Sequence, residues 1–469
     1  MRKFTYALID EKVIERKIHI LEALNNGQQL VTSQKLADQM RCSTRTIIKD
    51  ISQLKHELPE DWEIIAVKTK GYILIKPMED SILPVINSYL EKSALYKVVL
   101  GIFNNKHYTL EKWSQLLYMN KATLKNHLKS YTKVLNKNKL TIKFRNLQIE
   151  GDEMHLRYYY IAFFHFTQKF SDQYLFSIEL RNKLASILYR YEVHLDTSIL
   201  NSIIFVCINR FFNHHYLTKE IKFKPIYSHN QSNCINEIIV EIENYYKVKL
   251  PKLEKDVLNL FIFLVLVSTR SQGDVMLEYI SECDHKKFMN LIDTLFTNNK
   301  LPSKSKGNLK AKVIPYFYKA RILNELNLSI DYFSEPIDHF NIILFKNYME
   351  NMYLISSWNE IENDKQFTRD EITYIAAHVT PAINSSINEI NILLVFSVIT
   401  IEKEIIYKKL KLSLGENVKI DIIPNYNIKY DFIISNSQLP DTGAPVIYIS
   451  QMLTRHEIDS IKNYIINLN

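Results

Sequence analysis

Glycine and cysteine are scarce in this chain of 469 residues, which has eight of the former and four of the latter. The glycines are too far apart to form a dinucleotide-binding glycine triad or a Walker phosphate loop. Cys42, Cys207, Cys234 and Cys283 include no close pair, which excludes a zinc knuckle or redox pair and is typical of a reducing compartment. We therefore expect a cytoplasmic protein that is not a nucleotide enzyme of either type.

Long apolar runs and clusters of catalytic residues are missing as well. The first residues soon reach Asp10 and Glu11, which leaves no apolar signal-peptide core, and no apolar stretch approaches the length of a membrane span. The 14 histidines are dispersed, and the pair His214 and His215 has no acid or cysteine at ligand spacing. No Ser-His-Asp or paired-carboxylate pattern occurs. The sequence predicts no enzyme, no metal, no cofactor and no membrane partner.

The chain does have an asymmetric charge. Residues 1–155 contain 25 Lys and Arg against 17 Asp and Glu, whereas residues 156–469 contain 34 of each. Between 101 and 145, ten basic residues accompany a single acid, Glu111. An AT-rich gene would scatter lysines through the whole chain and does not explain this asymmetry. The basic density indicates a surface that binds a phosphate-lined polyanion, namely nucleic acid.

Residues 1–78 have the pattern of a winged helix-turn-helix domain. Apolar spacing predicts helices over residues 13–26, 33–40 and 44–54, with Ser43 as the N-cap of the third. The i, i+4, i+7 spacing places one set of side chains in the core: Ile47, Ile51 and Leu54. The opposite face presents donors for base edges and phosphates in a major groove. The expected DNA contacts are Ser43, Thr44, Arg45, Thr46 and Lys49, with Gln53 beyond them.

Alternating residues from Trp62 to Ile75 predict a β-hairpin with Gly71 at the turn. Lys68 and Lys70 would contact backbone phosphate or the minor groove from the tip of this wing. A small helical domain can also end in a hairpin that binds nothing. Three short helices followed by a basic hairpin favour the winged helix-turn-helix.

A second unit of the same kind is predicted for residues 79–155. Thr109 would cap one helix, and the next carries Leu124 and Leu128 on its inner face. Its outer face has a ridge of lysines at every fourth position, namely Lys121, Lys125 and Lys129. Because these like charges repel one another, the ridge favours an anionic partner. A solvated helix face is the alternative. A hairpin over 140–149 adds two further expected contacts, Lys143 and Arg145.

Several motifs resemble those of the Mga/AtxA family, which are virulence-gene activators of Gram-positive bacteria. They are Leu36-Ala37, Ser43 to Ile47, Asp50-Ile51, Leu54, Asn120 to Leu124, Ile149 to Glu153 and Arg157. The resemblance implies a multidomain, mostly α protein with two DNA-binding domains, two helical phosphotransferase-system regulation domains and a small α/β domain similar to a sugar-permease IIB subunit. The expected boundaries are 1–78, 79–155, 156–277, 278–387 and 388–469.

Apolar periodicity with few strand signals predicts that residues 156–385 are all helical, with helices such as 196–212, 236–246 and 253–268. By the resemblance, Ile203 and Phe261 replace the usual phosphoacceptor histidines of the first regulation domain. His194 could substitute for them only if the alignment shifts.

In the second regulation domain, Glu371 and His378 keep the family signature. The resemblance implies that a phosphocarrier protein of the phosphotransferase system phosphorylates His378 in a transient complex. A neutral imidazole nitrogen is a suitable nucleophile near physiological pH. The alternative is a histidine that only forms hydrogen bonds at a helix interface.

From residue 389 onward, short apolar strands alternate with helices, which predicts a small α/β domain with a parallel sheet. The expected strands are 390–398, 419–423, 432–435 and 446–449, and the expected helices are 401–414 and a last one from His456. Phe396 or Ser397 stands where a working IIB subunit has its cysteine, so phosphocysteine transfer is not expected. The resemblance implies dimerisation instead, and we expect a homodimer that buries Ile447, Ile449 or a face of the last helix.

The favoured function is a DNA-binding transcriptional regulator, an activator of virulence genes, that is controlled by phosphorylation and homodimerisation. An RNA-binding antiterminator would share the regulation domains but have a short β-rich head in place of two winged helices. A phosphotransferase enzyme would need the missing cysteine.

Overall fold

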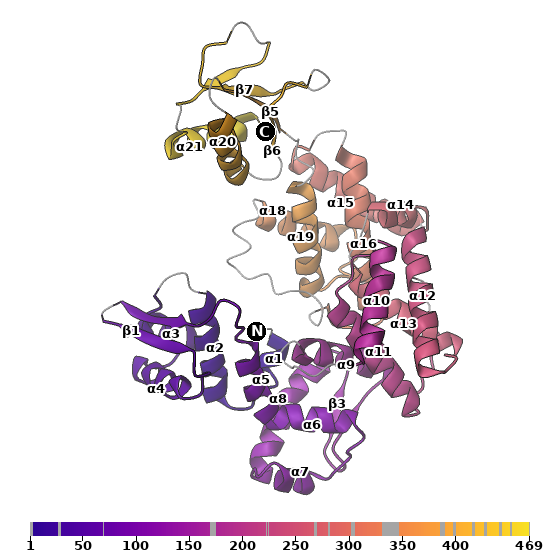
Figure 1. Cartoon of the computed structure of the whole chain (residues 1–469). Helices are drawn as coiled ribbons and strands as arrows, with labels where there is room; N and C mark the ends of the chain where they lie inside the picture. Colours follow the sequence, from indigo (N-terminus) through magenta and orange to yellow (C-terminus); the bar gives the residue numbers. More distant parts are fainter. Residues whose placement is uncertain are drawn as a thin grey trace. The chain divides into compact units, whose positions relative to one another are not determined.

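The computed structural model describes residues 3–26, 30–68, 70–168, 175–221, 223, 225–266, 270–279, 282–301, 305–330, 347–384, 390–396, 400–414, 418–425, 429–439, 443–450 and 453–468. The chain divides into two compact units (Figure 1), one formed by residues 1–268 and 318–337 and the other by residues 269–317 and 338–469. Over the described ranges, no helix is both long and apolar enough to cross a membrane.

The first helix-turn-helix is confirmed, together with its wing. It consists of α2 (Lys12–Asn26), α3 (Ser33–Met40) and α4 (Thr44–Lys55), followed by the antiparallel strands β1 (Glu63–Val67) and β2 (Gly71–Ile75). Ile47, Ile51 and Leu54 are buried, as predicted. Gly71 has a φ of +119°, and a Cβ there would lie 2.5 Å from the carbonyl oxygen of Val31. The glycine is required because Val31 pairs with Tyr72 and brings the two backbones together.

Three helices that flank the first helix-turn-helix in the sequence were not predicted. They are α1 (Lys3–Tyr6), α5 (Leu83–Lys92) and α6 (Ala94–Phe103). Only Ser93 separates α5 from α6, and its hydroxyl caps α6 by accepting a hydrogen bond from the amide of Tyr96. Most of α6 is buried, so it lacks the polar stripe by which an amphipathic helix is found in a sequence.

The second helix-turn-helix contains α7 (Leu110–Leu116) and α8 (Lys121–Asn136), followed by the short strands β3 (Thr141–Lys143) and β4 (Gln148–Glu150). The Thr109 hydroxyl caps α7 as predicted, at 3.2 Å from the amide nitrogen of Lys112. Leu124 and Leu128 are buried. The next helix, α9 (Glu153–Gln168), contains the expected domain boundary at residue 155.

The described residues between 156 and 384 contain helices and no strand, which agrees with the predicted all-helical region. After α9 these helices are α10 (Ile178–Arg190), α11 (Thr197–Phe212), α12 (His229–Tyr246), α13 (Lys252–Val265), α14 (Arg270–Tyr279), α15 (Glu282–Asn298), α16 (Lys306–Glu325), α18 (Tyr348–Ile361) and α19 (Arg369–Asn384).

Two predicted helix limits in this region were wrong. The helix expected from residue 236 begins at His229, because Ser228 and Gln231 form a capping box there. The helix expected to reach residue 268 ends at Val265, and residues 267–268 lie outside the described ranges.

The small α/β domain has the predicted parallel sheet. Its elements are β5 (Ile390–Val395), α20 (Thr400–Leu414), β6 (Val418–Asp421), β7 (Phe432–Ser435), β8 (Val446–Tyr448) and α21 (Arg455–Leu468). The strand order is β6-β5-β7-β8. The first strand is shorter than predicted and ends at Val395; Ser397 lies outside the described residues.

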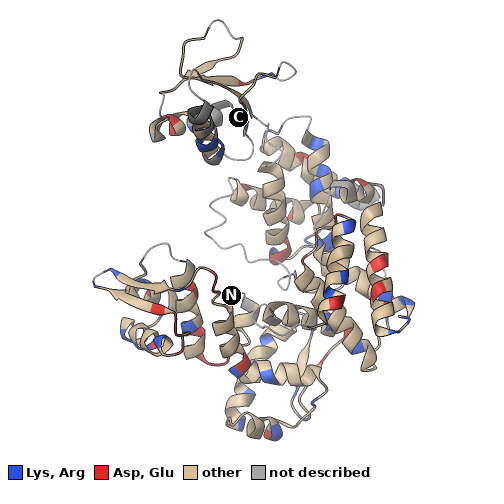
Figure 2. Ribbon diagram, viewed as in Figure 1, with Lys and Arg blue, Asp and Glu red and all other residues tan. Residues whose placement is uncertain are grey.

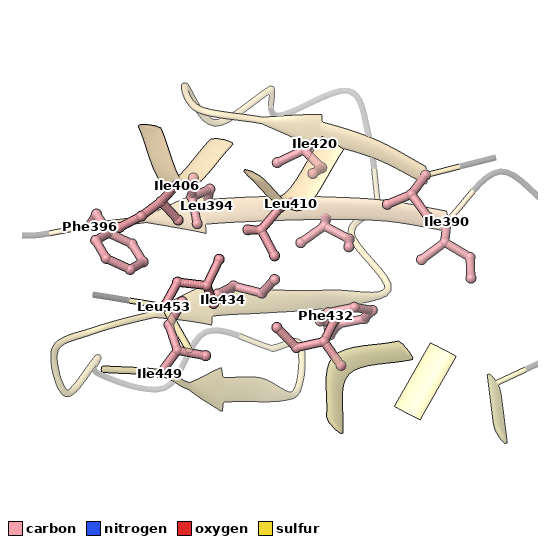
Figure 3. Close-up of a cluster of buried hydrophobic side chains, with 13 residues drawn as sticks. Ile390, Leu394, Phe396, Ile406, Leu410, Ile420, Phe432, Ile434, Ile449 and Leu453 are labelled. Atoms are coloured by element: carbon pink, nitrogen blue, oxygen red, sulfur yellow. The ribbon is translucent and has the colours of Figure 1, made fainter. Parts of the chain in front are cut away.

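A buried apolar cluster joins one face of this sheet to α20 and α21 (Figure 3). Leu394, Ile406 and Leu410 lie in this cluster. Ile449 belongs to it, so the expectation that this side chain lies between protomers was wrong, whereas Ile447 is partly buried against the cluster and its place in an interface stays a prediction. They are used inside the domain because the register pairs Ile434 with Ile447, so even-numbered residues of β7 and the odd-numbered Ile447 and Ile449 share the face covered by the helices.

Candidate nucleic-acid interface

The recognition helix of the first unit, α4, is fixed at its first turn by the predicted cap. The Ser43 Oγ accepts a hydrogen bond from the Thr46 amide at 3.1 Å and lies 2.8 Å from the Thr46 Oγ1. Arg45 and Lys49 are exposed, whereas Thr44 and Thr46 are half-buried. Ser43 and Thr46 therefore bond to each other, and the long cations of α4 are the side chains that extend into solvent.

A partly buried ion pair, which was not predicted from the sequence, holds α4 against α2. The Arg16 Nε donates to the Asp50 Oδ2 at 2.6 Å, and its Nη2 lies 3.3 Å from the Asp50 Oδ1. Asp50 is buried on the inner side of α4, and its hydrogen bond raises the pKa of Arg16. Bidentate pairing of this kind fixes orientation as well as distance. It therefore sets the direction in which Arg45 and Lys49 project.

The wing presents Lys68 and Lys70 at its tip, where both are exposed. The hairpin register pairs Val67 with Gly71, so the two lysines flank the turn between the strands. Figure 2 shows basic residues at this tip and along α4. Helix and wing therefore supply cations on separate elements of one small domain.

The lysines of the ridge on α8 are exposed, and the first of them, Lys121, is paired. The Lys121 Nζ forms an ion pair with Glu111, the single acid of this basic stretch. Lys125 and Lys129 are exposed, and the same four-residue spacing continues through Lys133 and Lys137, which were not among the predicted contacts. At 1.5 Å per residue, the ridge from residue 121 to 137 extends about 24 Å.

Of the two residues expected on the second hairpin, Lys143 pairs with Glu150 across the strands at 2.8 Å, and Arg145 is exposed in the turn. Lys121 and Lys143 therefore meet carboxylates that compete with phosphate. A third residue was missed: Tyr118 is 98% exposed in the turn before α8, with a φ of +51°.

The regulatory residues lie in the helical region. Ile203 on α11 and Phe261 on α13 are buried core residues, and His194 is exposed outside any helix. His378 is half-buried on α19, with its ring centroid 4.2 Å from that of Tyr316 and 4.3 Å from that of Tyr374. Its Nδ1 lies 2.8 Å from the carbonyl oxygen of Tyr374. Because a carbonyl only accepts, Nδ1 carries the proton and Nε2 has the lone pair of the neutral ring.

Glu371 of the same signature is buried and caps α19. The Thr368 amide donates to its Oε2 at 2.7 Å, and the Glu371 amide lies 3.4 Å from the Thr368 Oγ1. This reciprocal pattern is a capping box. The glutamate therefore has a structural role two helical turns away from His378.

Comparisons with known proteins agree with this geometry. Residues 16–73 match a family described as an HTH domain, and residues 79–164 match the Mga helix-turn-helix domain. These two matches show that the chain carries two helix-turn-helix domains, one after the other.

Three individual proteins are similar to part of the chain. The capsule synthesis positive regulator AcpB of Bacillus anthracis is 29% identical over 151 residues, which are 32% of this chain and 31% of that protein. The capsule synthesis positive regulator AcpA of the same organism is 31% identical over 146 residues, 31% of this chain and 30% of the relative. The anthrax toxin expression trans-acting positive regulator of Bacillus anthracis is 25% identical over 154 residues, 33% of this chain and 32% of that protein. Each alignment spans about a third of the relative. The resemblance to the Mga/AtxA family is confirmed, and the chain carries the Mga helix-turn-helix domain.

Proposed function

We propose that the protein is a DNA-binding transcriptional regulator that activates virulence genes and is controlled by phosphorylation and homodimerisation. The observation that carries the DNA-binding part is the presence of two capped recognition helices in one chain. Each presents long cations to solvent, Arg45 and Lys49 on α4 and Lys125 and Lys129 on α8. Activation is proposed because AcpB and AcpA are positive regulators by name.

Double-stranded DNA fits these elements better than RNA does. The major groove of B-form DNA admits an α-helix, whereas that of A-form RNA is too narrow for side chains to read. An RNA-binding antiterminator is therefore the weaker alternative. Gel shifts with a DNA duplex and an RNA duplex of the same sequence test this choice, and tighter binding to the RNA would contradict it.

The ridge on α8 is tested by charge reversal. Lys125→Glu with Lys129→Glu should weaken binding to all duplexes alike and make the affinity less dependent on salt, because fewer counterions are released. The matched control is Lys408→Glu with Lys409→Glu, which makes the same charge change at exposed positions of α20. Equal effects of the two pairs would mean that only net charge matters.

Arg45 is proposed to read a base. If it contacts a guanine edge, Arg45→Ala should relax the preference at one or two base pairs and cost about 1–3 kcal/mol of binding free energy. A loss that is uniform over all sequences would make Arg45 a phosphate contact. Mapping of bound DNA across the genome would identify the target promoters.

His378 is the proposed phosphoacceptor for a phosphocarrier protein of the phosphotransferase system. The support is the hydrogen bond of Nδ1 to the Tyr374 carbonyl, which places the lone pair of the neutral ring on Nε2, and the contact with Tyr316 of α16. A phosphoryl group would add up to two negative charges between α16 and α19 and favour their separation. We expect the phosphorylated protein to be less active and less dimeric.

The test compares His378→Asp, His378→Ala and the control His194→Ala. His378→Asp should favour monomer and low activity, His378→Ala should be active and indifferent to sugar supply, and the control should respond normally. Normal sugar responses of both His378 variants would assign the residue a structural role.

Homodimerisation is proposed through the small α/β domain. Parallel sheets are normally covered on both faces. Both described helices of the domain pack on one face. On the other face Ile433 and Ser435 of the central strand β7 are buried, and Tyr448 of the edge strand β8 is 55% exposed, so the exposed part of this face lies at β8. Sedimentation of a chain that ends near residue 388 tests the proposal, and a shortened chain that stays dimeric at micromolar concentration would place the interface elsewhere.

A further inference from the structure

A short segment before the first helix-turn-helix has no exposed residue. In residues 4–10, four side chains are less than a tenth exposed: Phe4, Thr5, Leu8 and Ile9. A segment of this kind loses conformational freedom on folding and needs compensating contacts. Its contacts lie on both DNA-binding units.

Tyr6 attaches the segment to the first unit. Its ring stacks on that of His19 with the centroids 4.2 Å apart, and its hydroxyl donates to the Glu22 Oε2 at 2.6 Å. The same hydroxyl lies 2.9 Å from the His19 Nδ1. His19 and Glu22 both belong to α2, the helix that Arg16 links to the recognition helix α4.

Phe4 and Leu8 attach the segment to elements that follow the first unit. The Phe4 ring centroid lies 5.9 Å from that of Tyr159 and 5.5 Å from that of Phe166, both on α9. The carbonyl of Leu8 accepts a hydrogen bond from the Ser93 hydroxyl at the joint between α5 and α6.

Asp10 connects the segment to the second recognition helix. Its Oδ2 accepts a hydrogen bond from the Ala94 amide at 2.9 Å, which satisfies a donor at the first turn of α6. The same oxygen lies 3.6 Å from the Nδ1 of His127 on α8. One carboxylate thus binds the start of α6 and faces the inner half of α8.

These contacts form a continuous path from α4, through α2, Tyr6 and Asp10, to α8. We propose that segment 4–10, with Asp10 as its main positioning residue, fixes the distance and angle between the two recognition helices. The protein then selects duplexes that carry two unlike half-sites at one fixed spacing. This inference rests on the proposed DNA-binding function.

The physical reason is the difference between a rigid and a flexible connection. A flexible connection lets two binding modules accept many spacings, whereas a rigid one concentrates the second module at one position. When the two helices are held rigidly, a duplex with the matching spacing binds both without a further loss of conformational freedom in the protein, and any other spacing requires a rearrangement. We expect the affinity for the matching spacing to be higher by about tenfold.

The first test measures the geometry without DNA. Spin labels at Ser52→Cys on α4 and Ser130→Cys on α8 would report the distance between the helices in the full chain, with Cys42 and Cys283 replaced by serine. Both labelled positions are exposed. The otherwise unchanged protein should give one narrow distance distribution. Asp10→Ala should broaden or shift it, whereas Glu11→Ala, at the exposed neighbouring residue, should not.

Two milder variants keep the test decisive if Asp10→Ala folds poorly. Asp10→Asn keeps an oxygen acceptor for the Ala94 amide but removes the charge that faces His127. Tyr6→Phe keeps the ring stack but removes both contacts of the hydroxyl. At least one should broaden the distribution while the helical circular dichroism stays unchanged, and unchanged distances in all three variants would overturn the inference.

The second test selects duplexes from a randomised library with the full chain. The unchanged protein should enrich one spacing about tenfold over its neighbours, and Asp10→Ala should lose most of this preference while it still binds each half-site. Enrichment of half-sites at many spacings by the unchanged protein would overturn the inference and leave the DNA-binding function intact. Failure to bind any duplex would refute both the DNA-binding function and the selection of one spacing. The distances between the spin labels would then still show whether segment 4–10 fixes the two helices.

Discussion

Replacement of Arg157 by methionine should destabilise the compact unit of residues 1–268 and 318–337 far more than the loss of any surface ion pair does. The Arg157 side chain is fully buried on α9. Its Nη1 and Nη2 donate to the two carboxylate oxygens of Glu254 on α13, at 2.5 and 3.1 Å. Its Nε donates to Glu153 at 3.0 Å, and Nη2 also donates to the carbonyl of His215 at 2.9 Å.

The magnitude follows from the charge that the variant leaves behind. Glu153 also pairs with Arg210 at 2.5 Å, so the buried group contains two acids and two bases. Without Arg157 the Glu254 carboxylate is buried and uncompensated, a situation that costs about 3–5 kcal/mol. Burial lowers the pKa of Arg157, but hydrogen bonding to Glu254 and the nearby carboxylates raise the pKa above its usual range, so the native arginine is charged.

A second substitution should recover much of the loss. Arg157→Met with Glu254→Leu removes one charge of each sign and leaves Glu153 paired with Arg210. Apolar replacement of both members of a buried pair is often neutral. The carbonyl of His215 still loses a donor, so a residual cost of about 1–3 kcal/mol is expected.

Denaturant unfolding followed by tryptophan fluorescence measures both variants. The chain has three tryptophans. A Trp358→Phe background leaves Trp62 and Trp113, which both lie in the compact unit of residues 1–268 and 318–337 and report on its unfolding. Lys143→Ala is the control, because its pair with Glu150 is about half exposed and should contribute at most about 1 kcal/mol. A cost of Arg157→Met below that of the control, or a double variant less stable than the single one, would refute the reasoning.

Three further predictions concern local structure. Ser43→Ala should lower the unfolding free energy by about 0.5–2 kcal/mol, because the Thr46 amide loses its acceptor; thermal unfolding of the Ser43→Gly variant, with a smaller loss, is the comparison. Gly71→Ala should destabilise the wing by more than about 1 kcal/mol through its positive φ, and hydrogen exchange at the Tyr72 amide should accelerate. Hydrogen bonding to Lys255 lowers the pKa of Glu243 to about 2, so its stabilisation is complete above pH 4.5 and is lost as the pH falls through 2; Glu243→Gln should lack this acid dependence in unfolding measurements.

The local parts of the DNA-binding units could be predicted from sequence because their signals are local. Ser43 and Thr109 stand directly before apolar-periodic segments and cap the helices that follow. The pairs Arg16 with Asp50 and Arg157 with Glu254 could not be predicted, because nothing in either local segment identifies a partner 34 or 97 residues away.

The lysine ridge could be predicted from the sequence only in part. The sequence shows that Glu111 is the single acid among ten basic residues, but it does not show which lysine Glu111 meets. The turn before α8, with Tyr118 at a positive φ, brings Lys121 to it. The composition therefore predicts the polyanion-binding surface, while the backbone of one turn decides which cations are paired.

The last prediction concerns Lys319, which is buried on α16 with its Nζ donating to the carbonyl of Leu266 at the end of α13. Burial lowers the pKa of Lys319 to about 7 from 10.5. Between these two values the unfolded chain binds more protons at this residue than the folded protein, so this residue makes stability rise as pH increases, by at most about 1.4 kcal/mol per pH unit.

Lys319→Met, which is of similar length and has no charge, should lack this rise. Unfolding free energies of both proteins at pH 7, 8 and 9 measure the difference, and the Lys252→Met variant, at an exposed position of α13, would control for the removal of a lysine as such. Parallel pH profiles of the Lys319→Met variant and the unchanged protein would show that Lys319 is protonated in the folded state over this whole range.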